Sequence, residues 1–440
     1  MAPSTTTSSL DSSYNSIIII KQATLDLPKR FQQFLLLNPA NGIIIAQFIT
    51  SLNTEMNPAK TYKSTIIEVL SMLLKYLRFK RFKDMTRDDI IAFLNSRRKT
   101  EEADALHKWI GTYNNYRRIL IRFFRWLYYP DIEGNKRPKP TCIDNIPELK
   151  RKEDSIYQPT DLWGPQEDVL FLKYCNSRRI KCYHMLARDL SARPHEILKL
   201  KIRDIVFKTE NGHQYAQANV NGKTGTRSIP LFNALPYYKD YLSSEHPFPN
   251  NPNSPVICGE GKSIGRPISE KALFRIYRTY KLEIFPKLLD SPVVTPEDKP
   301  KLKELLKKPW NPYVVGRHTS LTAKAKILKE PILKMHVGWR PKSMMHLRYE
   351  HWFGNEHSKI LLEEMGILPK DEFTDDLLLL RPKQCPNCSE QNQKDSRFCC
   401  KCKMILSYDA YEEMKEQQID KNTLEQLRTE MEALKRAVMK

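Results

Sequence analysis

Long apolar runs are absent from this 440-residue sequence. A membrane-spanning helix needs roughly 18 or more consecutive apolar residues. The run IIII at 17–20 is far shorter and ends at Lys21. The first residues, MAPSTTTSSLDSS, also lack the basic segment and apolar core of a signal peptide. We therefore expect no membrane association, a disordered N-terminal tail and a cytoplasmic location.

Acidic residues are scarce relative to basic ones. The 72 Lys and Arg outnumber the 51 Asp and Glu, which gives a net charge of +21 and a pI near 9.4. Selection for solubility alone would favour acidic residues. An excess of this size favours a polyanionic partner, and nucleic acid is the first candidate.

The nine cysteines do not form a disulfide framework. Four are scattered, and the other five lie within 385–402. This distribution agrees with an intracellular protein, in which a cysteine cluster binds metal more often than it forms disulfides.

No internal repeat is visible, and residues 60–130 have apolar residues at helical spacing. Thr86 is placed to cap one helix, and Pro130 to end another. On the latter helix Arg118, Arg122 and Arg125 share a face, which is either an ordinary solvated surface or one that follows DNA phosphates.

A Pro- and Lys/Arg-rich segment at 134–165 has the composition of an extended linker. Beyond it, 167–190 is predicted to be one helix. Asn-Gly pairs at 211–212 and 221–222 are typical of β-hairpin turns, and the chain then looks mostly helical to about 365.

Four stretches of this second region carry unusual polar residues. LSARPHEILKLKIRDI contains Arg193 and Glu196, and VNGKTGTRSIPL contains Lys223. NPYVVGRHTSLTA contains Arg317 and His318, and HVGWRPKSMMHLRYEHW contains Trp339 and Tyr349. Each residue alone could be an ordinary surface or core side chain. In this order, over roughly 60–355, the stretches resemble the tyrosine recombinase (phage integrase) family, and their residue sequences resemble those of archaeal members.

The resemblance implies a multidomain, mainly α architecture. A helical, SAM-like core-binding domain at 46–133 would follow an N-terminal extension at 1–45. After the linker, an α+β catalytic domain with a small antiparallel sheet would occupy 166–365. A zinc ribbon at 380–407 and a C-terminal helix at 408–440 would complete the chain.

The implied chemistry suits these residue types. Tyr349 would be the nucleophile that stores the phosphodiester energy in a covalent bond. Arg193 and Arg317 would stabilise the charge on the non-bridging oxygens. Lys223 would protonate the leaving 5′-oxygen.

Two further residues have roles in the same scheme. Glu196 would hold Arg193, and Trp339 would donate to the phosphate. The chain departs from the family pattern at Val314, where members usually carry histidine. Tyr313 and His318 both remain candidates for the missing donor.

Two CxxC pairs, Cys385/Cys388 and Cys399/Cys402, have the spacing of a tetrahedral thiolate site and resemble a zinc ribbon. A redox-active pair is the alternative. After them, Leu424, Leu427, Met431, Leu434 and Val438 form a short heptad seam, which would pack on its own domain or on a neighbouring protomer.

The sequence thus predicts a site-specific DNA recombinase or integrase that works without metal or other cofactor in the chemical step. The resemblance implies a homotetramer on paired DNA sites and association with the nucleoid. A topoisomerase IB-like relaxing enzyme and a catalytically silent DNA-binding protein remain alternatives.

Overall fold

The computed structural model describes residues 15, 17–151, 159–210, 213–222, 225–350, 362, 365–367, 379–415, 428–429 and 431. The chain divides into two compact units, Met1–Ile156 and Tyr157–Lys440. Most described residues are helical, with small antiparallel sheets in the second unit, so the predicted fold class is confirmed. No helix among the described residues is long and apolar enough to cross a membrane.

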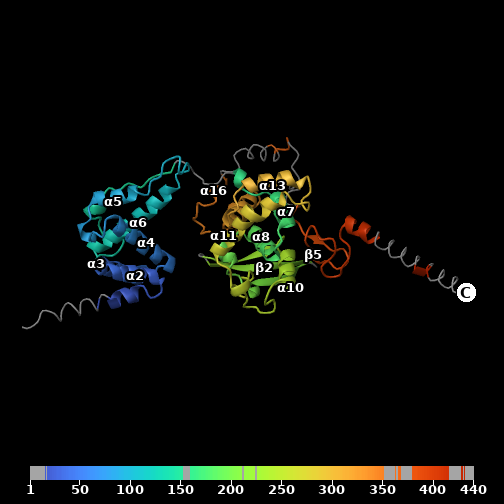
Figure 1. Ribbon diagram of the computed structural model, residues 1–440, viewed down its shortest axis with the longest axis horizontal. Coiled ribbons are helices and arrows are strands. Elements are labelled where there is room, and N and C mark those ends of the chain that lie inside the picture. The colour runs from blue at the N-terminus through green and yellow to red at the C-terminus, as the bar shows by residue number, and fades with distance from the viewer. Residues whose placement is uncertain are drawn as a thin grey trace, which may run out of the picture. The chain divides into compact units, whose positions relative to one another are not determined.

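The first unit is a bundle of helices around one apolar core (Figure 1). Thr86 caps α5 as predicted, because its side chain accepts from the N–H of Asp89. The last long helix ends at Tyr128, two residues before Pro130. The elements are α2 (Lys29–Leu37), α3 (Pro39–Met56), α4 (Lys60–Tyr76), η1 (Phe82–Asp84), α5 (Arg87–Asn95), α6 (Trp109–Tyr128) and η2 (Thr141–Ile143).

This core is larger than the predicted domain at both ends. Ile20 and Leu35, from the predicted N-terminal extension, are buried in it. So is Ile143, from the predicted linker. Asn114 of α6 exchanges two hydrogen bonds with the backbone of Leu149, at 2.7 and 3.0 Å, which ties the chain to the bundle that far. Residues 134–149 are therefore part of the first unit.

The second unit is built around helix α8 (Arg178–Leu190), which Figure 1 shows in the middle of that unit. The helices α7 (Pro165–Tyr174) and α8 were predicted as one. The break falls at Ser177, whose side chain accepts from the N–H of Ile180 and begins a new helix. The other helices before the candidate site's last segments are α9 (Pro194–Ile197), α10 (Leu235–Ser244), α11 (Glu270–Thr279), α12 (Phe285–Leu288) and α13 (Asp298–Lys307), with short η3 (Pro159–Asp161), η4 (Ile202–Asp204), η5 (Gly261–Ser263) and the π-helix η6 (Tyr280–Ile284).

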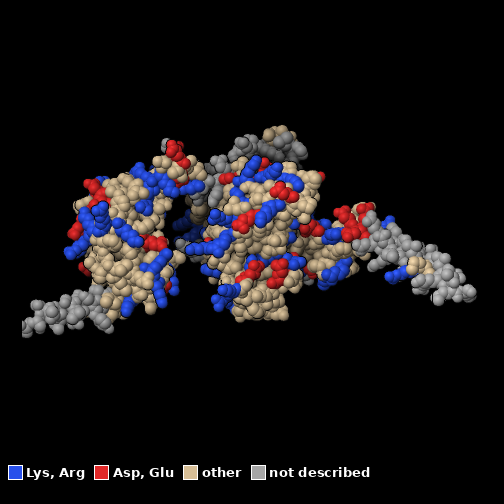
Figure 2. Space-filling view, in the orientation of Figure 1, with Lys and Arg blue, Asp and Glu red and all other residues tan. Residues whose placement is uncertain are grey.

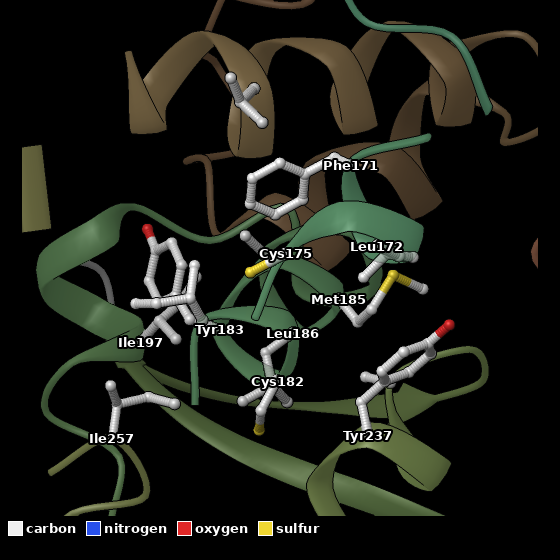
Figure 3. Close-up of a cluster of buried hydrophobic side chains, with 14 of the residues drawn as sticks. Phe171, Leu172, Cys175, Cys182, Tyr183, Met185, Leu186, Ile197, Tyr237 and Ile257 are labelled. Carbon is white, nitrogen blue, oxygen red and sulfur yellow. The ribbon is translucent and has the colours of Figure 1, made fainter. Parts of the chain in front are cut away.

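Both apolar and charged residues of α8 are buried. Figure 3 shows Cys182, Tyr183 and Leu186 of α8 in the same apolar core as Phe171 of α7. The ring of Phe171 lies 4.7 Å from that of His184, centroid to centroid. His184 in turn bonds Asp168 through Nε2 at 2.8 Å, so the buried carboxylate has a partner. A helix enclosed in this way fixes the position of the segment that follows it.

A three-stranded antiparallel sheet packs beside α8, with β1 (Ile205–Glu210), β2 (His213–Gly222) and β3 (Gly225–Leu231) in that order. The first Asn-Gly pair, predicted as a turn, lies outside the described residues. The second was also predicted as a turn, but Asn221 pairs with Thr226 and Gly222 with Gly225 inside the ladder, so both belong to β2. Ala216, Ala218 and Val220 of β2 are buried, as alternate residues on the core face of a strand are expected to be.

Candidate active site

The first part of the candidate site lies directly after α8. Ser191 has a left-handed backbone with φ of 49°, which turns the chain into α9. Arg193 occupies the N-cap of α9, and its Nη1 donates to Glu196 Oε1 at 2.9 Å. The Glu196 residue is only 2% exposed, whereas the Arg193 side chain keeps one third of its surface open. Arg193 is thus anchored on one side and accessible on the other.

A second arginine shares this carboxylate. Arg227 of β3 donates from Nη2 to Glu196 Oε2 at 2.8 Å and from Nε to the carbonyl of His336 at 2.9 Å. Burial raises the pKa of Glu196, but Arg227 and Arg193 outweigh burial and hold the pKa below its ordinary value. Glu196 is therefore ionised at neutral pH.

Arg317 lies in a π-helical turn, η7 (Tyr313–His318), a rare conformation that is frequent at functional sites. Arg317 is 5% exposed, and its Nη1 donates to the carbonyl of Ser191 at 2.8 Å. Burial and then the charge of Arg193 lower the pKa of Arg317 to about 10, opposed by the nearby Tyr349 and Glu196. Arg317 remains charged at neutral pH, close to the first half of the site.

Tyr349 belongs to the short helix α16 (Leu347–Glu350), and its hydroxyl lies 3.1 Å from His318 Nδ1. The centroid of its ring lies 5.9 Å from that of His318 and 5.8 Å from that of Trp339, with the planes inclined by 29° and 27°. The residue is 3% exposed and also contacts a small apolar cluster formed with α14 (Thr319–Ala325) and α15 (Glu330–Val337). Tyr349 is therefore both a packed ring and a hydroxyl held beside an imidazole.

A buried polar network lies behind Arg317. His336 Nε2 is 3.2 Å from Ser191 Oγ, and Lys324 Nζ donates to the same oxygen at 3.1 Å. Burial, followed by the charges of Lys324, Arg227 and Arg317, lowers the pKa of His336 to about 3. His336 is thus a neutral imidazole in cationic surroundings.

The structure brings most of the predicted site residues together. The contacts described above join six of them into one cluster: Arg193, Glu196, Arg317, His318, Trp339 and Tyr349. Val314, at the position where the family has histidine, is fully buried. Lys223 lies outside the described residues. Arg227 and His336 were missed, because no motif marks them, although both fall within the quoted stretches.

The three predicted arginines of α6 line a hollow of about 1030 Å³ on the first unit. Arg122 Nη1 donates to the hydroxyl of Tyr62 at 3.0 Å, and Arg125 Nη2 to the carbonyl of Asn135 at 3.2 Å. Arg117, Arg137 and Lys139 line the same hollow, and with the acidic Glu55, Asp131 and Glu133 they leave its lining with an excess of basic side chains.

The four predicted metal ligands form one cluster. The sulfur atoms of Cys385, Cys388, Cys399 and Cys402 all lie within 4.8 Å of one another. A tetrahedral Zn²⁺ site with bonds of about 2.3 Å requires sulfur atoms at such separations. The donor set therefore fits a structural zinc ion.

Two matching turns build this cluster beside the short strands β4 (Lys383–Gln384) and β5 (Gln391–Asn392). The residue after each CxxC pair, Ser389 or Lys403, has a left-handed backbone. Its N–H donates to the carbonyl of the first cysteine of its pair, at 2.8 Å for Ser389 and 3.0 Å for Lys403. Burial raises the pKa of Cys399, but backbone N–H groups and the neighbouring thiols lower it to about 6, so a thiolate forms readily there. Most of the predicted C-terminal heptad lies outside the described residues.

No family model and no curated protein matches the sequence. Solved structures do resemble the fold. A XerH site-specific recombinase bound to palindromic difH substrate, in a post-cleavage complex, aligns over 80% of this chain and 96% of its own, with 15% identity and a TM-score of 0.50. XerH bound to difH substrate in a pre-cleavage complex covers 78% and 94% of the two chains, with 16% identity and a TM-score of 0.48.

A lambda integrase tetramer bound to a Holliday junction covers 69% of this chain and 76% of its own, with 12% identity and a TM-score of 0.45. The chain has the fold of a tyrosine recombinase, because its helical bundle and small antiparallel sheet align with the XerH post-cleavage complex.

Proposed function

We propose that this protein is a site-specific DNA recombinase or integrase that breaks and rejoins DNA strands through a covalent 3′-phosphotyrosyl intermediate at Tyr349. The observation that carries the proposal is a buried tyrosine hydroxyl held 3.1 Å from Nδ1 of His318, the residue that directly follows the buried Arg317. Arg317 interacts electrostatically with both Arg193 and Tyr349. That set combines a nucleophile with charge stabilisation for a phosphate.

In the proposed reaction, the Tyr349 oxygen attacks the scissile phosphorus and the bond from phosphorus to the 5′-oxygen breaks. The phenolic proton passes to His318, whose Nδ1 already lies 3.1 Å from the hydroxyl. Lys223, between the ends of β2 and β3 in the sequence, is proposed to protonate the leaving 5′-oxygen. Attack by a 5′-hydroxyl of another strand reverses each step, so no energy source is required.

The charge balance of the site suits a phosphate. Arg193, Arg227 and Arg317 together carry three positive charges, and Glu196 contributes one negative charge among them. The remaining positive charge is available to the transition state, in which negative charge develops on the non-bridging oxygens. Trp339 is proposed to donate its indole N–H to one of these oxygens.

Two further proposals concern assembly. Four chains are proposed to assemble on two paired duplexes, one for each of the four strands that exchange, because each Tyr349 can hold only one 3′ end. Arg118, Arg122 and Arg125 are proposed to contact phosphates of the bound duplex. The zinc ion would have a structural role, because four thiolates leave no open coordination position.

A nicked suicide substrate tests the proposal, because the short 5′ fragment diffuses away and traps the covalent complex. Wild-type protein should form adducts that resist denaturation, and Tyr349→Phe should bind DNA yet form none. Tyr408→Phe is the matched control, since Tyr408 is 72% exposed and lies beyond the cysteine-rich segment, outside the candidate active site.

The same assay separates the alternatives. Absence of an adduct with wild-type protein would favour a silent DNA-binding protein. Adducts on any duplex, together with relaxation of supercoiled plasmid, would favour a topoisomerase IB-like enzyme. Adducts confined to one defined sequence would support recombination.

A further inference from the structure

Two buried side chains outside the proposed catalytic set connect its two arginines. We propose that Arg227 and His336 are positioning residues, and that they hold these arginines at a fixed separation. The inference rests on the proposed function and adds residues to it. Neither side chain has to touch the DNA for the proposal to hold.

The first half of the connection runs from Arg193 to Arg227. Glu196 receives Arg193 Nη1 on Oε1 at 2.9 Å and Arg227 Nη2 on Oε2 at 2.8 Å, so each oxygen holds one guanidinium. The Arg227 side chain is only 10% exposed, and that of Glu196 is 1% exposed. If the buried Glu196 carboxylate moved with one of these arginines, it would lose its hydrogen bond to the other.

The second half runs from Arg227 to Arg317. Arg227 Nε donates to the carbonyl of His336 at 2.9 Å, and the imidazole of His336 lies 3.2 Å from Ser191 Oγ. The carbonyl of the same serine accepts from Arg317 Nη1 at 2.8 Å. The connection therefore closes, because Ser191 precedes Arg193 by two residues.

Physical reasons make such a connection useful. Two guanidinium groups repel each other, and the charge of Arg193 contributes to the lowered pKa of Arg317. Without bound phosphate, that repulsion would separate them. Errors of about 1 Å in placing catalytic groups can cost on the order of 10²-fold in rate. A network that resists repulsion keeps the pair ready for the anion.

Arg227 suits the bridging position better than lysine would. Its planar fork donates in two directions at once, to Glu196 and to the carbonyl of His336. Close packing adds a second constraint, since a Cβ on Gly338 would come within 2.9 Å of Arg227 Nη1. The left-handed Gly338, with φ of 71°, thus lets the turn before Trp339 pass against the bridging arginine.

The test compares single-turnover cleavage of two substrates, one with a normal scissile phosphate and one with a methylphosphonate. Replacing a non-bridging oxygen by methyl removes the charge that the arginines stabilise. Arg227→Gln should slow cleavage of the phosphate on the order of 10²-fold. Cleavage of the methylphosphonate should change only a few-fold. The ratio of the two rates does not depend on the fraction of protein that folds.

Three further variants sharpen the result. Arg227→Lys keeps a charge beside Glu196 but cannot bridge, so it should show an intermediate loss. His336→Phe should show the same selective loss as Arg227→Gln, and His336→Gln, which can still bond Ser191, should lose less. Arg178→Gln is the control, because Arg178 also contacts two carboxylates, Asp240 at 3.2 Å and Glu245 at 3.3 Å, outside the site. It should behave like wild type on both substrates.

If Arg227→Gln lost the same fraction of the cleavage rate on both substrates, Arg227 would only support the fold. That result would overturn this inference but leave the proposed function standing. Full activity of Arg227→Lys on the phosphate would also overturn it, because charge without bridging would then suffice. An unchanged rate for His336→Phe would remove His336 from the connection. If wild-type protein cleaved neither substrate, the proposed function would fall and the inference with it.

Discussion

Lys324 shows how strongly single buried charges shape this site. Its Nζ donates to the carbonyls of Arg188 and Asp189, both at 2.7 Å, and to the hydroxyl of Ser191. Burial, partly offset by Asp189, lowers the pKa of Lys324 from 10.5 to about 8. The serine that carries the contact to Arg317 thus depends on an ammonium group that is costly to bury.

This pKa gives a testable pH dependence. Between pH 8 and 10.5 the unfolded chain binds a proton at Lys324 that the folded chain has released, so the free energy of unfolding rises with pH in that window. Relative to Lys324→Met, wild-type protein should gain on the order of 2 kcal/mol across it. Urea unfolding of both proteins at pH 7.5 and 10.5 measures the gain. An unchanged difference between them would show that Lys324 does not titrate in this range.

Loss of Arg317 should strongly reduce DNA cleavage. Arg317→Ala removes charge stabilisation at the transition state, and we expect adduct formation to fall by about 10²-fold or more. A 5′-bridging phosphorothiolate, whose sulfur leaves without a proton, should not restore the rate. The same substrate should rescue Lys223→Ala. Rescue of Arg317→Ala, or cleavage by it at the wild-type rate, would contradict the assigned role.

Sequence reasoning named the candidate site residues that stand in recognisable stretches. Arg193, Arg317 and Tyr349 lie near one another in the structure, and their assignment to an active site stays a prediction. Arg227 was beyond reach, since its partners, Glu196 and His336, lie 31 and 109 residues away. Only the packing of β3 against α15 reveals that an ordinary strand arginine bridges them.

At the scale of elements, the cysteine turns were the most predictable feature. The CxxC spacing fixes both the sulfur positions and the tight turns, and the structure brings all four sulfur atoms together. The π-helical turn at Tyr313–His318 could not be predicted, because no residue pattern distinguishes it from an α-helix. The strand pairing of Asn221 and Gly222 was also missed, because an Asn-Gly pair normally indicates a turn.

The cysteine cluster is connected to the rest of its unit by side-chain contacts. Lys239 of α10 forms an ion pair with Glu390, which lies between the two cysteine turns, and Gln393 donates to Asp240 at 3.2 Å. Asn392 spans both turns, because its amide donates to the carbonyl of Glu390 and its oxygen accepts from the N–H of Cys400 at 2.8 Å. The fold of the cluster and its contact with α10 therefore depend on each other.

Removal of the metal should break this contact. Purified protein should contain one zinc ion per chain, and Cys399→Ser should contain much less, because structural zinc contributes directly to folding. Hydrogen exchange at Glu390 and Asn392 should accelerate after chelation, while α8 stays protected. The exposed Cys400→Ser is the control and should retain the metal. Unchanged exchange after complete zinc removal would refute the link.

At the scale of the whole molecule, charge is the dominant feature. Figure 2 shows Lys and Arg side chains spread over both units in this view, among smaller groups of Asp and Glu. The net charge of +21 makes DNA binding depend on the release of counterions from the duplex. Binding should therefore weaken steeply as salt is added.

Salt dependence also tests the α6 arginines. Each phosphate contact removed should lower the slope of log K against log salt concentration by about 1. Alanine at Arg118, Arg122 and Arg125 together should lower it by up to about 3. Arg30→Ala is the control, because Arg30 pairs with Glu68 at 2.6 Å on an exposed part of α2. An unchanged slope in the triple variant would place the phosphate contacts elsewhere.

The proposed function depends on a covalent bond between Tyr349 and DNA. Mass spectrometry of the protease-digested adduct formed on the suicide substrate detects this bond. We expect one modified peptide, with a nucleotide 3′-phosphate linked to the oxygen of Tyr349. Attachment to any other residue, or through a 5′-phosphate, would contradict it.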